Sequence, residues 1–158
     1  MGRRSSEKKN PISSLPVLEL DDGTCISESI AICRYFEELH PAPALFGSTP
    51  LEKAEIEMWM RRAELYVYIP IDMSGPDFLG AEAAEKFRGF ANQAMRFLDR
   101  ELADREFIAG KGYTIADIFA FGAIDYGIQV TGRFEIAPDQ KNLERWYRAA
   151  ASRPSAGA

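Results

Sequence analysis

The chain has 158 residues, of which 46% are hydrophobic and 27% charged, a size at which a sizeable core can be buried. Its formal net charge of −5 argues against a general nucleic-acid-binding protein, because such proteins present basic surfaces to the phosphate backbone. No stretch approaches the roughly eighteen apolar residues of a membrane span, and the basic start of the chain has no apolar segment behind it. We therefore expect a cytoplasmic protein with no membrane or nucleic-acid partner.

Residues that bind metals or form disulfides are scarce. The two cysteines, Cys25 and Cys33, do not form a C-x-x-C pair, and His40 is the single histidine. A zinc site or a histidine-dependent catalytic triad would find too few ligands, so we expect no metal. We expect both cysteines to be reduced and buried, and His40 to lie at a helix end before Pro41.

The first predicted elements are a β-hairpin and a helix. Short apolar runs at residues 15–20 and 24–27 flank Asp22-Gly23, and glycine accepts the positive φ that a hairpin turn requires. From residue 28 the apolar residues recur at helical spacing, and this helix should end before Pro41. Two strands alone are marginally stable, so helices or further strands should cover them.

The rest of the chain is predicted to be helical. The proline-rich segment 43–50 resembles a linker, so we place one domain at residues 1–42 and another at residues 51–158. A helix is predicted from about residue 51, and Pro70 should end or kink it. Further helices are predicted over 81–103 and 142–150. The core stripe expected for the 81–103 helix consists of Phe87, Phe90, Ala91, Ala94, Phe97 and Leu98.

A capping box marks the start of another helix. Thr114 occupies the N-cap position and Asp117 follows three residues later, where the two residues can satisfy each other's hydrogen bonds. Residues 118–124 are apolar on nearly every side, which is typical of a helix in the centre of a bundle.

Two points near the hairpin could bind a ligand. Pro16 stands where a strand begins, and a cis peptide there would leave the preceding backbone groups free to pair with an extended peptide. Ser29 lies in the first turn of its helix, where its N–H and hydroxyl can hold an anion. Taken alone, these residues favour the simpler alternative, in which Ser27 or Ser29 caps the helix and Pro16 starts a strand.

Two motifs together resemble the cytosolic glutathione S-transferase family. The stretch NPISSLPVLELDDGTCISESIAICRYFEELHP is similar to the second half of that family's thioredoxin-like domain. The stretch GKGYTIADIFAF resembles the N-capping box motif of its all-helical C-terminal domain. The resemblance covers about residues 10–156. It implies an α+β, mostly helical fold: a partial thioredoxin-like βα unit, made of a hairpin and a helix, followed by an all-α bundle.

The resemblance implies a detoxifying transferase that conjugates the thiol of glutathione, its substrate, to a small hydrophobic electrophile. It also implies a homodimer. Pro16 would be cis, and Leu15 would pair its backbone N–H and C=O with the cysteinyl residue of glutathione. Ser29 would bind the γ-glutamyl carboxylate, and Glu28 the γ-glutamyl amino group.

Other residues receive weaker assignments from the resemblance. Tyr66 and Tyr68 would line a pocket for the second substrate, with core packing or a dimer contact as equally good explanations. Thr114 and Asp117 would be structural.

In the family, the residue that activates the thiol (Ser, Cys or Tyr) lies at the junction of a strand and a helix that precede this region. Too few residues precede Asn10 to form that strand and helix, so we expect the activating residue upstream of this chain. Two alternatives to an active enzyme follow: a non-catalytic binding or dimerisation module, and a truncated product.

Overall fold

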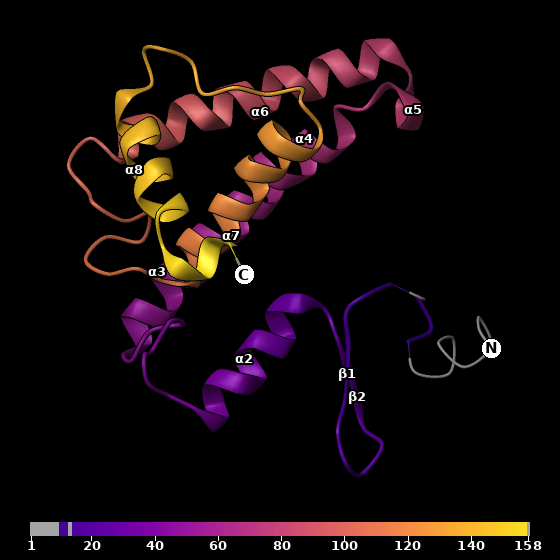
Figure 1. Ribbon diagram of the computed structural model, residues 1–158, viewed down its shortest axis with the longest axis vertical. Helices are drawn as coiled ribbons and strands as arrows, with labels where there is room; N and C mark the ends of the chain where they lie inside the picture. The colour runs from indigo at the N-terminus through magenta and orange to yellow at the C-terminus, as the bar shows by residue number, and fades with distance from the viewer. Residues whose placement is uncertain (1–9, 13, 158) are drawn as a thin grey trace. The chain divides into compact units, whose positions relative to one another are not determined.

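The computed structural model describes residues 10–12 and 14–157, which divide into two compact units between Leu45 and Phe46 (Figure 1). The described elements of the first unit are the strands β1 (Val17–Glu19) and β2 (Cys25–Ser27) and the helix α2 (Ser29–Leu39). Those of the second unit are helical: α3 (Pro50–Arg62), the π-helical η1 (Ala63–Tyr68), α4 (Ile69–Met73), α5 (Pro76–Leu79), α6 (Ala81–Glu101), α7 (Ile115–Asp125), the π-helical η2 (Tyr126–Val130), α8 (Lys141–Ala151) and the 3₁₀ turn η3 (Pro154–Gly157).

The predicted hairpin is confirmed, with shorter strands than expected. β1 and β2 pair antiparallel with Leu18 opposite Ile26. In the turn, the Leu20 N–H donates to the Thr24 carbonyl over 2.8 Å, and the Gly23 N–H donates to the Leu20 carbonyl over 2.9 Å. Gly23 has a φ of 85°, the left-handed conformation that made Asp-Gly a hairpin signal.

The helix α2 follows the hairpin as predicted, but its apolar face is not covered by the described residues. No residue of α2 is buried, and Phe36 and Leu39 are 46% and 54% exposed. The expectation of buried cysteines is therefore wrong: Cys25 is half-buried, and Cys33 on α2 is exposed. Cysteine packs as a small apolar residue only where a neighbouring layer encloses it.

The second unit is built around α7, as its apolar composition predicted. This helix packs against α3, η1 and α8, while α6 packs against η1, α4 and α8 (Figure 1). Ala116, Ala120 and Ile124 are completely buried along α7. Small alanines on a central helix allow the neighbouring helices to approach closely.

Of the two outcomes expected at Pro70, an end to the helix is wrong, because helical structure continues through α4 to Met73, whereas a kink stays a prediction. The π-helical segment η1 ends at Tyr68, two residues before the proline, and the next residue, Ile69, donates its N–H to the carbonyl of Glu64, five residues back. Proline cannot donate a backbone hydrogen bond, and its ring clashes with the preceding turn of a regular α-helix. The wider π-helical turn lies where that clash would occur.

The predicted core stripe of α6 is only partly correct. Ala84, Ala91, Ala94, Met95 and Leu98 are buried, whereas Phe90 is 57% exposed and Phe87 and Phe97 are half-buried. Helical periodicity identifies the apolar side of a helix but does not say which of its residues face the neighbouring helix. On α6 the alanines, Met95 and Leu98 face the core, and the large aromatic rings lie at the margin.

The predicted capping box is present and forms part of a larger network. The Asp117 carboxylate is completely buried, and its Oδ2 accepts hydrogen bonds from the Thr114 N–H over 3.0 Å and from the Thr114 hydroxyl over 3.1 Å. Its Oδ1 accepts from the Ile108 N–H over 2.8 Å and from the Trp146 indole Nε1–H over 2.9 Å. One carboxylate thus joins the start of α7 to the preceding loop and to α8.

Candidate functional site

The hairpin brings the two candidate binding segments of the first unit to one end. Val17 lies opposite Ser27 in the antiparallel register. This pair is the one farthest from the turn. In an antiparallel hairpin one strand begins where the other ends, so the residues just before Val17 and just after Ser27 lie at the same end of the hairpin. Leu15–Pro16 and Glu28–Ser29 occupy those positions.

The Leu15–Pro16 peptide is cis. The side chain of Leu15 is 87% exposed, and neither its N–H nor its carbonyl bonds another backbone group among the described residues. An extended peptide can use such free groups to pair as an added strand would.

Glu28 adopts a left-handed backbone conformation between β2 and α2, with φ 73° and ψ 117°. Among the described residues it is the only non-glycine residue with a positive φ. For a residue with a Cβ this conformation costs on the order of 1 kcal/mol or more, and such strained residues gather at binding sites. The Glu28 side chain is exposed.

The N-terminus of α2, which begins at Ser29, lacks a side-chain cap and has no acidic residue in its first turn. By contrast, the N-terminus of α3 is closed by a capping box. There the Glu52 N–H donates to the Thr49 hydroxyl over 3.2 Å, and the Thr49 N–H donates to a Glu52 carboxylate oxygen over 3.1 Å. The first N–H groups of α2 are therefore free of side-chain partners in the part of the chain that the structure describes, and they can bind an anion.

Sequence reasoning missed the role of Asn10 in this region. The Asn10 side chain donates to the Ser14 carbonyl over 2.8 Å and accepts from the Ile12 N–H over 3.1 Å, so it spans the loop before Leu15. The available signal was the turn-forming pair Asn10-Pro11, because asparagine side chains bond the backbone two residues on. That signal does not reveal the second bond, to Ser14.

The structure does not bring Tyr66 and Tyr68 together. Residues two apart on a helix face different sides, and Tyr66 lines a groove against α6 whereas Tyr68 contacts α7. The Tyr68 ring lies 6.2 Å from Phe119 and 6.2 Å from Tyr126, measured between centroids. Burial raises the pKa of the Tyr68 phenol, and the charge of Asp72 acts in the same direction, so this hydroxyl is protonated at neutral pH.

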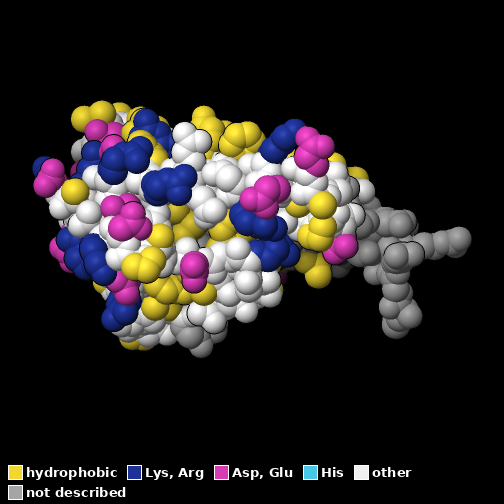
Figure 2. All heavy atoms as spheres, turned by 90° about the horizontal axis from the view of Figure 1, so that it is seen from above, with side chains coloured by type: hydrophobic (Ala, Val, Ile, Leu, Met, Phe, Trp, Pro, Cys, Tyr) yellow, Lys and Arg dark blue, Asp and Glu magenta, His cyan; other side chains and the backbone are white. Residues whose placement is uncertain are grey.

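The groove at Tyr66 has a volume of about 610 Å³ and lies between the α3–η1–α4 helices and α6. Its lining is mostly apolar and consists of Arg62, Leu65, Tyr66, Ile69, Pro70, Phe87, Phe90, Gln93, Ala94, Phe97 and Arg100. The aromatic residues of α6 that the sequence assigned to the core therefore form one wall of an open surface feature. Figure 2 shows one face of the molecule, on which hydrophobic side chains lie among interspersed basic and acidic ones.

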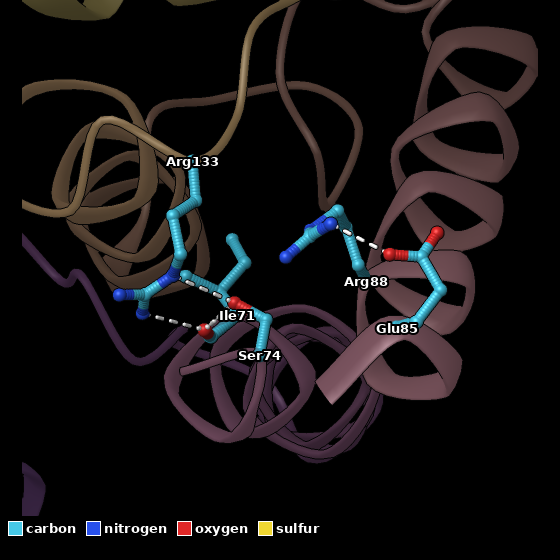
Figure 3. A network of polar contacts seen from close by, with 5 residues as sticks. All are labelled: Ile71, Ser74, Glu85, Arg88 and Arg133. Atoms are coloured by element: carbon cyan, nitrogen blue, oxygen red, sulfur yellow. Dashed lines mark hydrogen bonds and ion pairs between the residues drawn. The ribbon is translucent and has the colours of Figure 1, made fainter. Parts of the chain in front are cut away.

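A polar network fixes the end of the helix that carries both tyrosines. Arg133 donates from Nε to the Ser74 hydroxyl over 3.0 Å and from a terminal nitrogen to the Ile71 carbonyl over 3.4 Å (Figure 3). In the same view Arg88 pairs with Glu85 over 2.6 Å. Ser74 is completely buried, so its hydroxyl serves this network and is not accessible to a substrate.

The described residues contain neither a metal-binding cluster nor a membrane-spanning helix. No group of three or more His, Cys, Asp or Glu within them could hold a metal ion. None of their helices is both long and apolar enough to cross a membrane.

Comparison with known families matches both units. The glutathione S-transferase C-terminal domain model matches residues 62–154, and the corresponding N-terminal domain model matches residues 1–44. Glutathione S-transferase 2 of Saccharomyces cerevisiae is 34% identical, over 93% of this chain and 67% of that protein. Probable elongation factor 1-gamma 1 of Arabidopsis thaliana is 29% identical, over 94% of this chain and 37% of that protein.

Solved structures share the fold. The crystal structure of Gtt2 from Saccharomyces cerevisiae has a TM-score of 0.87 and 32% sequence identity, over 98% of this chain and 79% of that chain. The class Gtt2 glutathione S-transferase of Vibrio parahaemolyticus has a TM-score of 0.89 and 30% identity, over 99% of this chain and 76% of that one. The chain thus spans about two thirds of the yeast protein and little more than a third of the elongation-factor relative.

Proposed function

We propose that this chain, which belongs to the glutathione S-transferase family, binds glutathione at the end of the hairpin where β2 enters α2. One observation carries the proposal: the register of β1 and β2 places the cis Leu15–Pro16 segment beside the uncapped start of α2. A small peptide with a carboxylate at one end needs those two features together, namely a backbone to pair with and helix N–H groups to hold the anion.

Each residue has a distinct role in this proposal. The backbone of Leu15 pairs with the cysteinyl residue of glutathione. The Ser29 hydroxyl and the first N–H groups of α2 bind the γ-glutamyl carboxylate, and the Glu28 carboxylate accepts a hydrogen bond from the γ-glutamyl amino group. The ligand supplies its own nucleophile, a thiolate, and no metal takes part.

The proposed reaction joins the glutathione sulfur to a small hydrophobic electrophile in the cytoplasm, as a detoxification step. The thiol gives its proton to water, the sulfur bonds the electrophilic carbon, and the electron pair goes to a departing group or to the atom released by an opened bond. We propose Tyr68 as the contact for the electrophile, through its protonated phenol beside two aromatic rings. Tyr66, the other residue expected to line the second-substrate pocket, lies in a separate groove, for which a dimer contact is proposed below. The variant Tyr68→Ala should raise KM for the electrophile, and Tyr66→Ala should leave it unchanged.

A non-catalytic binding module is the second candidate function. It is favoured by the similarity to elongation factor 1-gamma proteins. Two of them, from Arabidopsis thaliana, match 94% and 93% of this chain. A conjugation assay with 1-chloro-2,4-dinitrobenzene separates the two candidates once glutathione binding is established. Glutathione binding without product formation would favour the module.

We also propose that the chain forms a homodimer in which a second copy covers the groove between η1 and α6. Phe90 and Tyr66 are 57% and 60% exposed in this groove, and exposed aromatic residues in one apolar patch are typical of protein interfaces.

The direct test of glutathione binding is thermal unfolding with and without the ligand. At a concentration of about 100 times the dissociation constant, a ligand adds about 2.7 kcal/mol to the free energy of unfolding. The variant Ser29→Ala should reduce this gain, whereas Glu38→Gln, at the far end of α2, should retain it. No gain at millimolar glutathione would refute the binding site.

A further inference from the structure

The side-chain amide of Asn10 joins both ends of the short loop that leads into the cis Leu15–Pro16 peptide. Its Nδ2 donates to the Ser14 carbonyl over 2.8 Å and lies 3.2 Å from the Ser14 hydroxyl oxygen. Its Oδ1 accepts from the Ile12 N–H over 3.1 Å. The amide therefore uses both its donor and its acceptor on the backbone of residues 12 and 14.

Asn10 is also the one buried residue among the described residues of the first unit, with 3% of its surface exposed. Asparagine is mostly exposed in proteins, because burying an amide is costly unless its hydrogen bonds are satisfied. Among the described residues of the first unit no apolar side chain is buried, and the neighbouring Leu15 is 87% exposed. The hydrogen bonds of Asn10 are therefore the described contacts that hold the backbone of Ile12 and Ser14.

The bond to the Ser14 carbonyl controls the orientation of Leu15. The carbonyl of Ser14 and the N–H of Leu15 belong to one planar peptide group, and in a trans peptide they point in opposite directions. Only the Leu15–Pro16 and Ala42–Pro43 peptides are cis in the described part of the chain, so the Ser14–Leu15 peptide is trans. When Asn10 holds the carbonyl on one side, the Leu15 N–H is directed to the opposite side.

We propose that Asn10 is a positioning residue for glutathione, which aims the Leu15 N–H at the carbonyl of the cysteinyl residue. This inference rests on the glutathione site proposed above. Asn10 does not contact the ligand itself; it fixes the orientation of the Ser14–Leu15 peptide group, whose N–H contacts the ligand. Because such a residue orders the loop before the ligand arrives, the loop loses less conformational entropy on binding.

The test compares two ligands by calorimetry on the full chain: glutathione, and its thioamide analogue with sulfur in place of the cysteinyl carbonyl oxygen. Sulfur is the poorer acceptor, so wild-type protein should bind the analogue roughly five- to tenfold more weakly. The variant Asn10→Asp keeps an acceptor for the Ile12 N–H but loses the donor to Ser14. It should bind glutathione about tenfold more weakly and should distinguish the two ligands by less than about twofold.

Two matched variants separate positioning from general damage to the site. Ser29→Ala should weaken both ligands while preserving the wild-type ratio between them, because Ser29 binds the other end of the molecule. Ser14→Ala removes only the hydroxyl and leaves the carbonyl bond, so its affinities should stay within about twofold of wild type. If Asn10→Asp prefers glutathione over the thioamide analogue by the same factor as the wild-type protein, the proposal is overturned.

A measurement on wild-type protein covers the case in which Asn10→Asp unfolds the hairpin, seen as loss of amide protection in β1 and β2. In a ¹⁵N NMR titration with glutathione, the Leu15 amide and the Asn10 side-chain amide should shift and saturate together. If the protein binds glutathione but the Leu15 amide resonance does not shift, the proposed role of Asn10 is refuted and the glutathione site is not. Absence of all binding would instead refute the glutathione site.

Discussion

The indole N–H of Trp146 on α8 donates to the Oδ1 of Asp117 at the start of α7, over 2.9 Å in the interior of the helical unit. The same oxygen accepts from the Ile108 N–H, and the other accepts twice from Thr114. Each donor was satisfied by water before folding, so each depends on this carboxylate in the folded state.

Replacing Asp117 with alanine should therefore destabilise the protein severely. The change leaves the Ile108 and Trp146 donors buried without a partner, and each such group costs about 1–3 kcal/mol. We expect a loss of at least about 3 kcal/mol in urea unfolding followed by tryptophan fluorescence. The control Asp104→Ala, at an exposed position in the loop after α6, should change stability by less than about 0.5 kcal/mol. A small effect at Asp117 would mean that water replaces the carboxylate.

The backbone and the carboxylate of Glu28 can be separated by two substitutions. Glycine tolerates the φ of 73° whereas alanine does not, so Glu28→Gly should be more stable than Glu28→Ala by about 1 kcal/mol. Both variants lack the carboxylate, and both should bind glutathione more weakly than wild type. Full affinity in Glu28→Gly would show that only the backbone of residue 28 contributes to the site.

The two units should differ in local stability. Among the described residues of the first unit only Asn10 is buried, whereas the second unit buries a core that includes Trp146, Ile71 and Met95. Local opening is easiest where few apolar groups are buried. In hydrogen exchange, the β1 and β2 amides should exchange much faster than those of α7. Equal protection would require a covering contact on the first unit, such as a second copy of the chain.

The features that could be predicted from the sequence are local ones. Asp22-Gly23 determines a turn through the φ of one residue, and Thr114 with Asp117 determines a helix start through four consecutive positions. The exposure of Phe90 could not be predicted, because it depends on which side of α6 meets η1 and α4. The continuation of the helix past Pro70 depends on a π-helical turn that has no sequence signal of its own. The second bond of Asn10, to Ser14, depends on the path of the loop.

The domain limits remain a prediction as well. The sequence places a linker at residues 43–50, and limited proteolysis would test whether cleavage concentrates there.

The last prediction concerns the groove at Tyr66. If a second copy of the chain covers this groove, a charge placed on its wall should separate the copies. The new carboxylate would be buried in the interface without a partner, and its desolvation penalty would weaken association of the two copies. We expect Phe90→Asp to shift sedimentation from dimer toward monomer at micromolar concentration. The control Met58→Asp introduces the same charge on α3 at a residue that is 40% exposed and lies outside the groove lining, and it should remain dimeric. A wild-type chain that sediments as a monomer at every concentration would leave the groove open and exclude the proposed dimer.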